Sequence, residues 1–561
     1  MRSRVLIAML FLSACGGGNG SPGPGGGQPT LAVVNARIWT GDPARPWAEA
    51  LAARGDAILM VGSSADVRAR AGGAALIDAN GQLVLPGFID SHVHFLDGGF
   101  RLSSVQLRDA GSRDEFVSRI RAFAQTVKPG TWITGGDWDH SLWGGQLPTR
   151  EWIDAATPEH PVWVSRLDGH MALANSAALA AAGVTRAAKD VAGGTIVRDP
   201  AGDPTGVLKD NAMALVDKVV PAPPPDLEDR ALDAAMRYVA ERGVTSVHNM
   251  GSWNDLAVFT RARRSNRLTT RIYASVPLAR WQQLRDRIAH REDGGDDGRG
   301  DGWLRVGGLK GFVDGSLGSH TAAFLEPFSD APRDAGLLVN TPEDLHAWID
   351  GADKSHLNVM VHAIGDRANR LILDIFERVA RDNGARDRRF RVEHAQHLAP
   401  PDIPRFAALG VIASMQPYHA IDDGRWAEKV IGPARIETTY AFRALLDAGA
   451  TLAFGSDWFV APPKPIEGIY AAVTRRTLDD RNPGGWVPQQ KITVEEAIRA
   501  YTAGGAFASF EESRKGTLAP GKLADFVMLD RNLFEIPPDR IREVHPVLTV
   551  VGGRQVFAAS R

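Results

Sequence analysis

Short apolar runs of strand length recur along this 561-residue chain, and longer polar–apolar patterns separate most of them. One such pattern, over residues 366–382, has the length and apolar spacing of a helix. Strands that alternate with helices predict an α/β fold with a parallel sheet. Eight candidate strands can be counted, the number that a TIM barrel requires, and they begin near Pro86, Val244, Arg271, Arg305, Asn358, Arg389, Val411 and Thr451.

The two ends of the chain predict further β-structure. Residues 31–77 alternate β-type runs with Gly and Asp turns, and residues 526–529 and 548–551 continue that pattern after the last barrel strand. Between the first two barrel strands lie about 145 residues, far more than one connection from a strand to a helix needs. We therefore expect an insertion over about residues 100–240 that forms a lid or one wall of the substrate pocket.

Several of the predicted strands end in side chains that bind metals. His92 and His94 end the first barrel strand, and residues i and i+2 of a strand point to the same side, so both imidazoles can reach one ion. Catalytic residues of barrel enzymes lie at the C-terminal ends of the strands. Four later strands end in metal-binding side chains at that same face, namely Lys310, His362, His394 and Asp457.

This order of strand-end residues, His-x-His, Lys, His, His and Asp, resembles the amidohydrolase superfamily of metal-dependent hydrolases. Four motifs resemble the amidohydrolase family 3 branch that includes N-substituted formamide deformylase: Gly-Asp-Trp-Asp at 136–139, Arg-Leu-Asp-Gly-His at 166–170, Phe-Val-Asp-Gly-Ser at 312–316 and Val-Glu-His-Ala-Gln at 392–396. Residues 516–526 are similar to a return segment that many superfamily members share. The resemblance implies a (β/α)8 TIM barrel with a small flanking β-sandwich built from both chain ends.

The resemblance also implies a centre of two divalent metal ions, expected to be zinc. The ligands fall into two sets, a more buried one of His92, His94 and Asp457 and a more exposed one of His362 and His394. Lys310, carboxylated by carbon dioxide, is expected to bridge the two ions as an anionic ligand. That reaction requires a neutral amine, so the site must lower the lysine pKa from ~10.4. An ordinary lysine at a strand end is the alternative.

A metal-activated hydroxide in such a centre can attack a carbonyl that the metals polarise. The resemblance therefore implies cleavage of a non-peptide C–N amide bond in a small molecule. Asp457 is expected to act as general base and to pass the proton of the attacking water to the leaving nitrogen, with helix capping as its structural alternative. The sequence has no Gly-x-Ser-x-Gly motif of a serine hydrolase. Two alternatives stay open: a lactonase or other esterase with the same ligands, and a catalytically inactive, lipid-anchored barrel that binds solutes.

Several further residues are candidates for contact with the substrate. Asp168 and His170 recur in the branch motif, although they could instead fix the insertion in place. Trp138 and Trp458 could build an apolar pocket together with Trp143, Trp426 and Phe459, although tryptophans in loops could equally pack against the barrel. The alternation of side chains along a strand directs Glu393 away from the lumen.

The first 15 residues predict export from the cytoplasm. Two arginines precede an apolar core over residues 5–12, which is far shorter than the ~20 residues of a membrane span and is typical of a signal peptide. Leu-Ser-Ala-Cys at 12–15 looks like a bacterial lipobox, in which Cys15 becomes the lipidated first residue; an ordinary secretory signal is the alternative. Residues 16–29, rich in Gly and Pro, predict a flexible tether that spans on the order of 20 Å. We expect a lipoprotein anchored to a membrane and facing the periplasm.

Composition adds limits to these predictions. A net charge of −2 gives no electrostatic reason to expect nucleic acid as a partner, and a hydrophobic content of 44% suffices for a large core. A single cysteine excludes an internal disulfide. We expect a β-sandwich from residues 30–85 and 511–561, a barrel over residues 86–510, a small amide as the substrate, and contact with the membrane through the lipid anchor only. A homo-oligomer remains possible.

Overall fold

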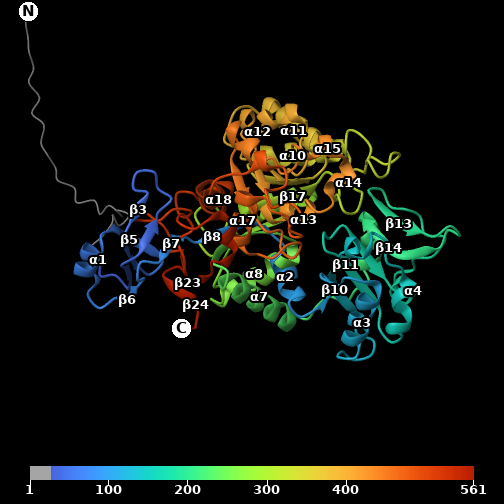
Figure 1. Ribbon diagram of the computed structural model, residues 1–561, viewed down its shortest axis with the longest axis horizontal. Coiled ribbons are helices and arrows are strands. Elements are labelled where there is room, and N and C mark those ends of the chain that lie inside the picture. The colour runs from blue at the N-terminus through green and yellow to red at the C-terminus, as the bar shows by residue number, and fades with distance from the viewer. Residues whose placement is uncertain (1–26, 561) are drawn as a thin grey trace, which may run out of the picture.

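The computed structural model describes residues 27–560 (Figure 1). Cys15 and residues 16–26 of the expected tether lie outside the described residues. No helix within residues 27–560 combines the length and the apolar character that crossing a membrane requires.

A parallel barrel forms the centre of the molecule. Its strands follow one another around the sheet in the order of the sequence, and each begins within two residues of its predicted start. The eight strands are β8 (Phe88–Val93), β15 (Val244–Met250), β16 (Arg271–Pro277), β17 (Leu304–Phe312), β18 (Asn358–Ala363), β19 (Arg391–His394), β20 (Ile412–Met415) and β21 (Leu452–Phe454). The predicted α/β fold, a (β/α)8 TIM barrel, is confirmed.

The barrel closes between its first and last strands through the segment that follows β21. The amide of Asp457 donates to the carbonyl of His92 at 2.7 Å, and the amide of His94 donates to the carbonyl of Trp458 at 2.6 Å. The buried carboxylate of Asp90 accepts from the amide and the hydroxyl of Ser456, at 2.8 and 2.6 Å. These bonds fix the position of Asp457 beside the end of β8.

Helices pack around the outside of the barrel (Figure 1). In α11 (Asp366–Asp382), which has the predicted bounds, Ile372, Phe376 and Val379 lie on one face at helical spacing and are fully buried. Burial of each such side chain contributes about 1.5–3 kcal/mol. The other outer helices are α7 (Pro225–Ala240), α8 (Trp253–Arg264), α9 (Trp281–Ala289), α10 (Pro342–Lys354), α12 (Ile403–Ala408), α16 (Phe442–Asp447) and α17 (Pro465–Thr474).

Two packed sheets flank the barrel, and both ends of the chain contribute to them. One sheet contains β1 (Leu31–Val34), β4 (Ala50–Arg54), β5 (Ala57–Gly62) and β6 (Ala75–Asp78). The other joins N-terminal and C-terminal strands through the antiparallel pair β7–β22, and it contains β2 (Arg37–Trp39), β3 (Trp47–Ala48), β7 (Leu83–Pro86), β22 (Phe526–Leu529), β23 (Pro546–Val551) and β24 (Arg554–Ala558). Val33 and Leu51 of the first sheet share one core with Phe526 and Val550 of the second.

The segment between β8 and β15 builds a separate six-stranded sheet, at the right of Figure 1. Its core is apolar and lies apart from the core of the barrel. Its strands are β9 (Val105–Gln106), β10 (Ile133–Trp138), β11 (Val162–Arg166), β12 (Met171–Ala174), β13 (Gly194–Arg198) and β14 (Pro204–Asp210), with α3 (Arg113–Ala124) packed against them. The turns that follow β10 and β11 lie at the C-terminal end of the barrel.

Candidate metal centre

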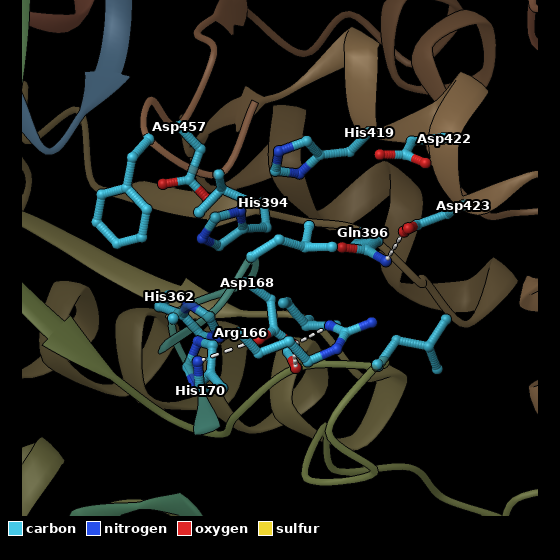
Figure 2. A pocket seen from close by; sticks show the side chains of 18 of the residues that line it. Arg166, Asp168, His170, His362, His394, Gln396, His419, Asp422, Asp423 and Asp457 are labelled. Atoms are coloured by element: carbon cyan, nitrogen blue, oxygen red, sulfur yellow. Dashed lines mark hydrogen bonds and ion pairs between the residues drawn. The ribbon is translucent and has the colours of Figure 1, made fainter. Parts of the chain in front are cut away.

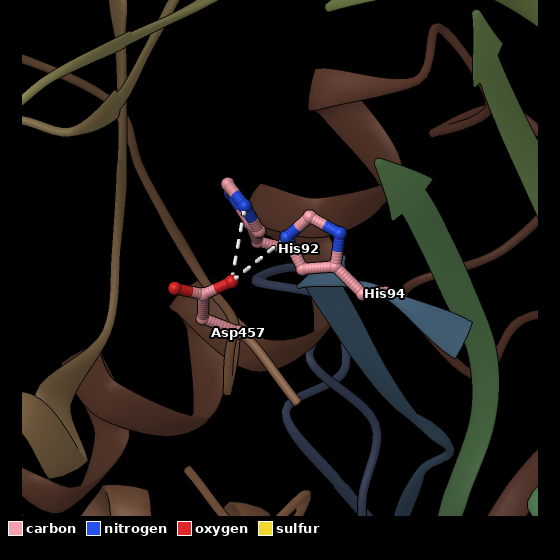
Figure 3. A group of neighbouring side chains, drawn as sticks. All are labelled: His92, His94 and Asp457. Carbon is pink, nitrogen blue, oxygen red and sulfur yellow. Dashed lines mark ion pairs between the residues drawn. The ribbon is translucent and has the colours of Figure 1, made fainter. Parts of the chain in front are cut away.

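His92, His94 and Asp457 meet at the C-terminal end of β8 (Figure 3). Nε2 of His92 lies 3.4 Å and Nε2 of His94 lies 3.3 Å from Oδ1 of Asp457. Within residues 27–560 no group donates a hydrogen bond to this buried oxygen. Two imidazole nitrogens and an unsatisfied carboxylate oxygen suit a divalent cation such as zinc, because leaving that oxygen buried without a partner is costly.

Glu393 orients the His92 ring. Its Oε2 lies 2.5 Å from Nδ1 of His92, and its Oε1 lies 2.9 Å from Nε of Arg391, with all three side chains fully buried. Burial holds the pKa of His92 well below its ordinary value, so the ring is neutral and carries one proton. The carboxylate keeps that proton on Nδ1, which leaves the lone pair of Nε2 directed to the centre.

The position of Glu393 corrects the sequence prediction, which directed this side chain away from the lumen. The backbone leaves the strand conformation at the next residue, since φ is 74° at His394 and 43° at Ala395. Regular alternation therefore stops at His394, so the side chains of Glu393 and His394 both face the interior. Nδ1 of His394 bonds Oε1 of Gln416 at 2.8 Å, which leaves Nε2 of His394 as its free nitrogen.

A second group of possible ligands shares Asp457 and includes a residue absent from the sequence prediction. It consists of His394, His419 and Asp457, whose ligand atoms lie within 4.8 Å of one another. His419 lies in α13 (Pro417–Asp423), just after β20. Because His419 is on a helix, a search confined to strand ends could not find it. The ring of His394 lies 6.5 Å from that of His419 and 4.5 Å from that of His362, measured between centroids.

Lys310 and His362 lie in the same cavity but outside these two groups. Nζ of Lys310 is 3.2 Å from Nε2 of His92, and burial lowers the pKa of Lys310 to about 8. Nε2 of His362 bonds the carbonyl of Gly315 at 3.0 Å, while its ring centroid is 4.5 Å from that of His394. Both residues therefore lie where the sequence predicts, at the ends of β17 and β18.

A cavity of ≈ 290 Å³ opens from the metal centre toward the inserted sheet (Figure 2). Asp168 and His170 line it on the inserted side. Oδ2 of Asp168 accepts from Nη1 of Arg166 at 2.6 Å and from the Ser316 hydroxyl, and Nδ1 of His170 lies 2.7 Å from Oδ1 of Asp210. The insertion therefore forms one wall of the cavity.

The charges of this wall follow from those contacts. Burial opposes ionisation of Asp168, but the charges of Arg166 and His170 outweigh it and lower the pKa of Asp168 to about 2. Burial likewise opposes protonation of His170, yet its hydrogen bond to Asp210 raises the pKa of His170 above its ordinary value. The wall thus presents an anchored carboxylate and, on His170, a ring nitrogen that can donate to a ligand.

A protein-family model described as the amidohydrolase family matches residues 75–557. This chain belongs to the amidohydrolase family. The resemblance predicted from its strand-end residues is confirmed. The family and the His/Asp groups indicate a divalent metal site in this amidohydrolase.

Relatives match this amidohydrolase over nearly its whole length. It is 42% identical over 548 residues to Protein LONG AFTER FAR-RED 3 of Arabidopsis thaliana, covering 95% of this chain and 92% of that protein. It is 29% identical over 554 residues to N-substituted formamide deformylase of Arthrobacter pascens, covering 93% of this chain and 97% of that protein. The crystal structure of an uncharacterized metal-dependent hydrolase from Pyrococcus horikoshii matches with a TM-score of 0.73 and 28% identity, covering 91% of this chain and 99% of that chain.

Two tryptophans expected to line the substrate pocket of the amidohydrolase do not reach the cavity. Trp138 is fully buried in the core of the inserted sheet, where its Nε1 donates to the carbonyl of Val164 at 2.9 Å. Trp458 stacks on Tyr238 with ring centroids 5.2 Å apart. A Cβ on Gly98 would lie 2.5 Å from the Trp458 ring, so this glycine gives the indole the space to pack behind the site.

Two other aromatic side chains of the predicted apolar group line the cavity. Phe459 follows Trp458 and lines the cavity, with its ring centroid 5.7 Å from that of His94. Trp426 lines the cavity from the segment after α13. One sequence does not tell which aromatic side chains of such loops face the cavity and which pack behind it.

Proposed function

We propose that this amidohydrolase cleaves a non-peptide C–N amide bond in a small molecule. The observation that carries the proposal is the single carboxylate of Asp457, which belongs to both possible ligand groups and stands at the inner end of a cavity of ≈ 290 Å³. A cavity near the lower limit of small-molecule sites suits a compact substrate. The similarity to N-substituted formamide deformylase favours an amide over an ester.

We further propose that the centre holds two divalent ions, with zinc as the expected metal. His92 and His94 would hold the more buried ion with Asp457, and His362 and His394 the more exposed one, with His419 as a further ligand beside His394 and Asp457. Divalent ions held by these ligands would supply a water of lowered pKa and would polarise the scissile carbonyl. Carboxylation of Lys310, whose Nζ lies 3.2 Å from the ring of His92, would add a bridging anion to the same centre.

Residues of this chain then carry the proton and hold the substrate. Asp457 takes the proton of the attacking water and delivers it to the leaving nitrogen, so that the amine departs neutral. His170 donates from Nε2 to an acceptor on the substrate, because its Nδ1 is engaged by Asp210. Phe459 covers the cavity beside His94 and limits the access of water.

The proposal is tested with a substrate panel on metal-free and reconstituted enzyme. N-formyl, N-acyl and cyclic amides are compared with lactones and esters of matched size, first after chelation and then after zinc is restored. We expect turnover of at least one amide class that disappears on chelation and returns with metal. Preferential turnover of lactones would identify an esterase instead, and binding without turnover by the reconstituted protein would identify a solute-binding barrel.

For its location, we propose that the mature enzyme begins at a lipidated Cys15. The lipid would hold the enzyme at a membrane, facing the periplasm, and the Gly- and Pro-rich residues 16–29 would separate the barrel from the surface. A substrate of the extracytoplasmic space could then reach the cavity without crossing the inner membrane.

A further inference from the structure

A second cavity, of ≈ 280 Å³, lies at the opposite end of the barrel from the metal centre. Its lining comes from the starts of β17 and β18, from the loop before β19 and from the segment after α19 (Gly505–Ala508). Metal ligands and substrate-facing residues all belong to the other end, so this cavity has no part in the proposed hydrolysis. Four of its lining residues are arginines, namely Arg299, Arg305, Arg386 and Arg388.

The arginine cavity has fewer carboxylates than guanidinium groups. Arg386 and Arg388 share a single partner, the buried carboxylate of Asp353. Asp387 is the one carboxylate on the lining within the part of the chain that the structure describes, and it pairs with Arg389 at 2.9 Å. The guanidinium groups of Arg386 and Arg388 therefore share one carboxylate, and the carboxylate of Asp387 forms its ion pair with Arg389.

Arg299 adds a guanidinium that has no ion-pair partner in residues 27–560. Its one hydrogen bond, at 2.9 Å, goes to the backbone carbonyl of His356. Arg305 beside it pairs with Asp297. An arginine that lines a cavity and has no carboxylate can bind an anion without first breaking an ion pair.

Tyr273 supplies an unused donor in the same cavity. Tyr273 lines the cavity, and its hydroxyl forms no hydrogen bond with another group in the described residues 27–560. Burial raises the pKa of Tyr273, so the hydroxyl keeps its proton. A hydroxyl with no partner in the protein can donate to an acceptor bound in the cavity.

The side chains of Tyr273 and Arg299 approach each other beside Gly307. A Cβ placed on Gly307 would lie 2.7 Å from Nη1 of Arg299 and 3.2 Å from the hydroxyl oxygen of Tyr273. The two donors thus converge over a residue that has no side chain. Any larger residue at position 307 would occupy the space between them.

We propose that the arginine cavity binds an oxyanion of the phosphate class, either a free phosphate or the phosphate of an anionic lipid headgroup. A tetrahedral oxyanion offers enough acceptor oxygens for the guanidinium of Arg299, the shared pair Arg386 and Arg388, and the hydroxyl of Tyr273 together. Guanidinium groups match phosphate oxygens through paired N–H donors. The bound anion would also stabilise this end of the barrel, because it binds the folded state only.

The test is calorimetric titration of the full-length protein with inorganic phosphate, at constant ionic strength set with chloride. We expect saturable binding that weakens at least tenfold in Arg299→Gln and several-fold in Tyr273→Phe, which removes only the hydroxyl. Arg230→Gln removes the same charge from an exposed helical ion pair with Asp226 and should leave binding unchanged. Thermal midpoints without phosphate check that each variant is folded.

Gly307→Ala gives a second test that changes no charge. The added methyl group should displace Arg299 and weaken phosphate binding while the metal content stays that of the wild type. The proposal is overturned if the wild type binds phosphate no better than chloride, or if Arg299→Gln and Gly307→Ala both bind it as the wild type does.

A vesicle experiment then identifies the source of the phosphate. Wild-type and Arg299→Gln proteins, both carrying Cys15→Ala to remove any lipid anchor, are sedimented with phosphatidylglycerol or phosphatidylcholine vesicles. Loss of phosphatidylglycerol binding in the Arg299 variant supports a lipid headgroup. Equal sedimentation of the two proteins, with calorimetric binding still dependent on Arg299, supports a free phosphate.

Discussion

The carboxylate of Glu393 lies 2.5 Å from Nδ1 of His92, in a part of the barrel where neither side chain is exposed. The same carboxylate contacts Arg391 at 2.9 Å, so it is fixed from both sides. Because the proton of His92 is held on Nδ1, the opposite nitrogen keeps one orientation toward Asp457. Partners of this kind set the direction and basicity of a metal-binding imidazole.

Glu393→Gln should weaken zinc binding by about 10–100-fold, because the amide cannot replace the charge that holds the His92 proton in place. Zinc affinity of the metal-free protein, measured by competition with a chelator, gives the result directly. Glu511→Gln is a matched control, since Glu511 is equally buried but pairs with Lys515 away from the centre. It should lower stability without changing zinc affinity. Equal zinc affinity in Glu393→Gln and the wild type would contradict the orienting role.

The strand-end residues could be predicted because barrel geometry brings them together. In a parallel barrel every strand ends at one face, so a short apolar run followed by a metal-binding side chain identifies the site without tertiary information. His92, His94 and Asp457 meet these conditions and lie within ligand distance of one another. The number of barrel strands and the helix at residues 366–382 could also be predicted, since both depend on local apolar spacing.

Residues outside regular strand geometry could not be predicted in this way. His419 lies on a helix, and the alternation counted back from His394 fails for Glu393 because φ is 74° at His394. Neither feature leaves a periodic signal in one sequence. The prediction for Trp138 was wrong for a related reason, since the inserted sheet that buries it forms through pairings between strands distant in sequence, such as Ile133 with Val162 and Met171 with Lys209. Such pairings depend on tertiary packing more than on local pattern.

The pair Arg271–Asp525 should be worth more to stability than the exposed contact beside it. Arg271 is fully buried and contacts Asp525 through two nitrogens, at 2.6 and 2.9 Å, which joins the barrel to the flanking sheets. Asp525→Ala would leave the buried guanidinium with the carbonyl of Gly302 and, as its one carboxylate, Asp56, which is 44% exposed, so we expect a loss of about 3–5 kcal/mol. Asp56→Ala should cost less than about 1 kcal/mol. Urea denaturation midpoints of the two variants measure which substitution costs more stability. Equal midpoints would contradict the larger contribution of Asp525.

Lipidation at Cys15 predicts a change of location on substitution. Labelling of cells with a radioactive fatty acid should mark the wild-type protein and fail to mark Cys15→Ala, which should appear in the soluble periplasmic fraction. Stable attachment needs more than one acyl chain, as bacterial lipoproteins are expected to carry. Ser13→Ala keeps the cysteine and serves as the control. A wild-type protein that takes up no label would contradict the lipoprotein assignment and favour an ordinary secretory signal.

Lys310→Ala tests the bridging lysine. Loss of the side chain removes the anion that balances two nearby cations, so the metal content should fall from about two ions per chain toward one, and activity should fall by orders of magnitude. Metal analysis and turnover are measured on the same preparation. Formate or acetate in excess should restore part of both, because a small carboxylate can occupy the vacated space. Lys310→Arg should not be restored, since arginine fills that space and keeps its charge. If Lys310→Ala retained two metals and wild-type turnover without added acid, Lys310 would be an ordinary residue at the end of β17.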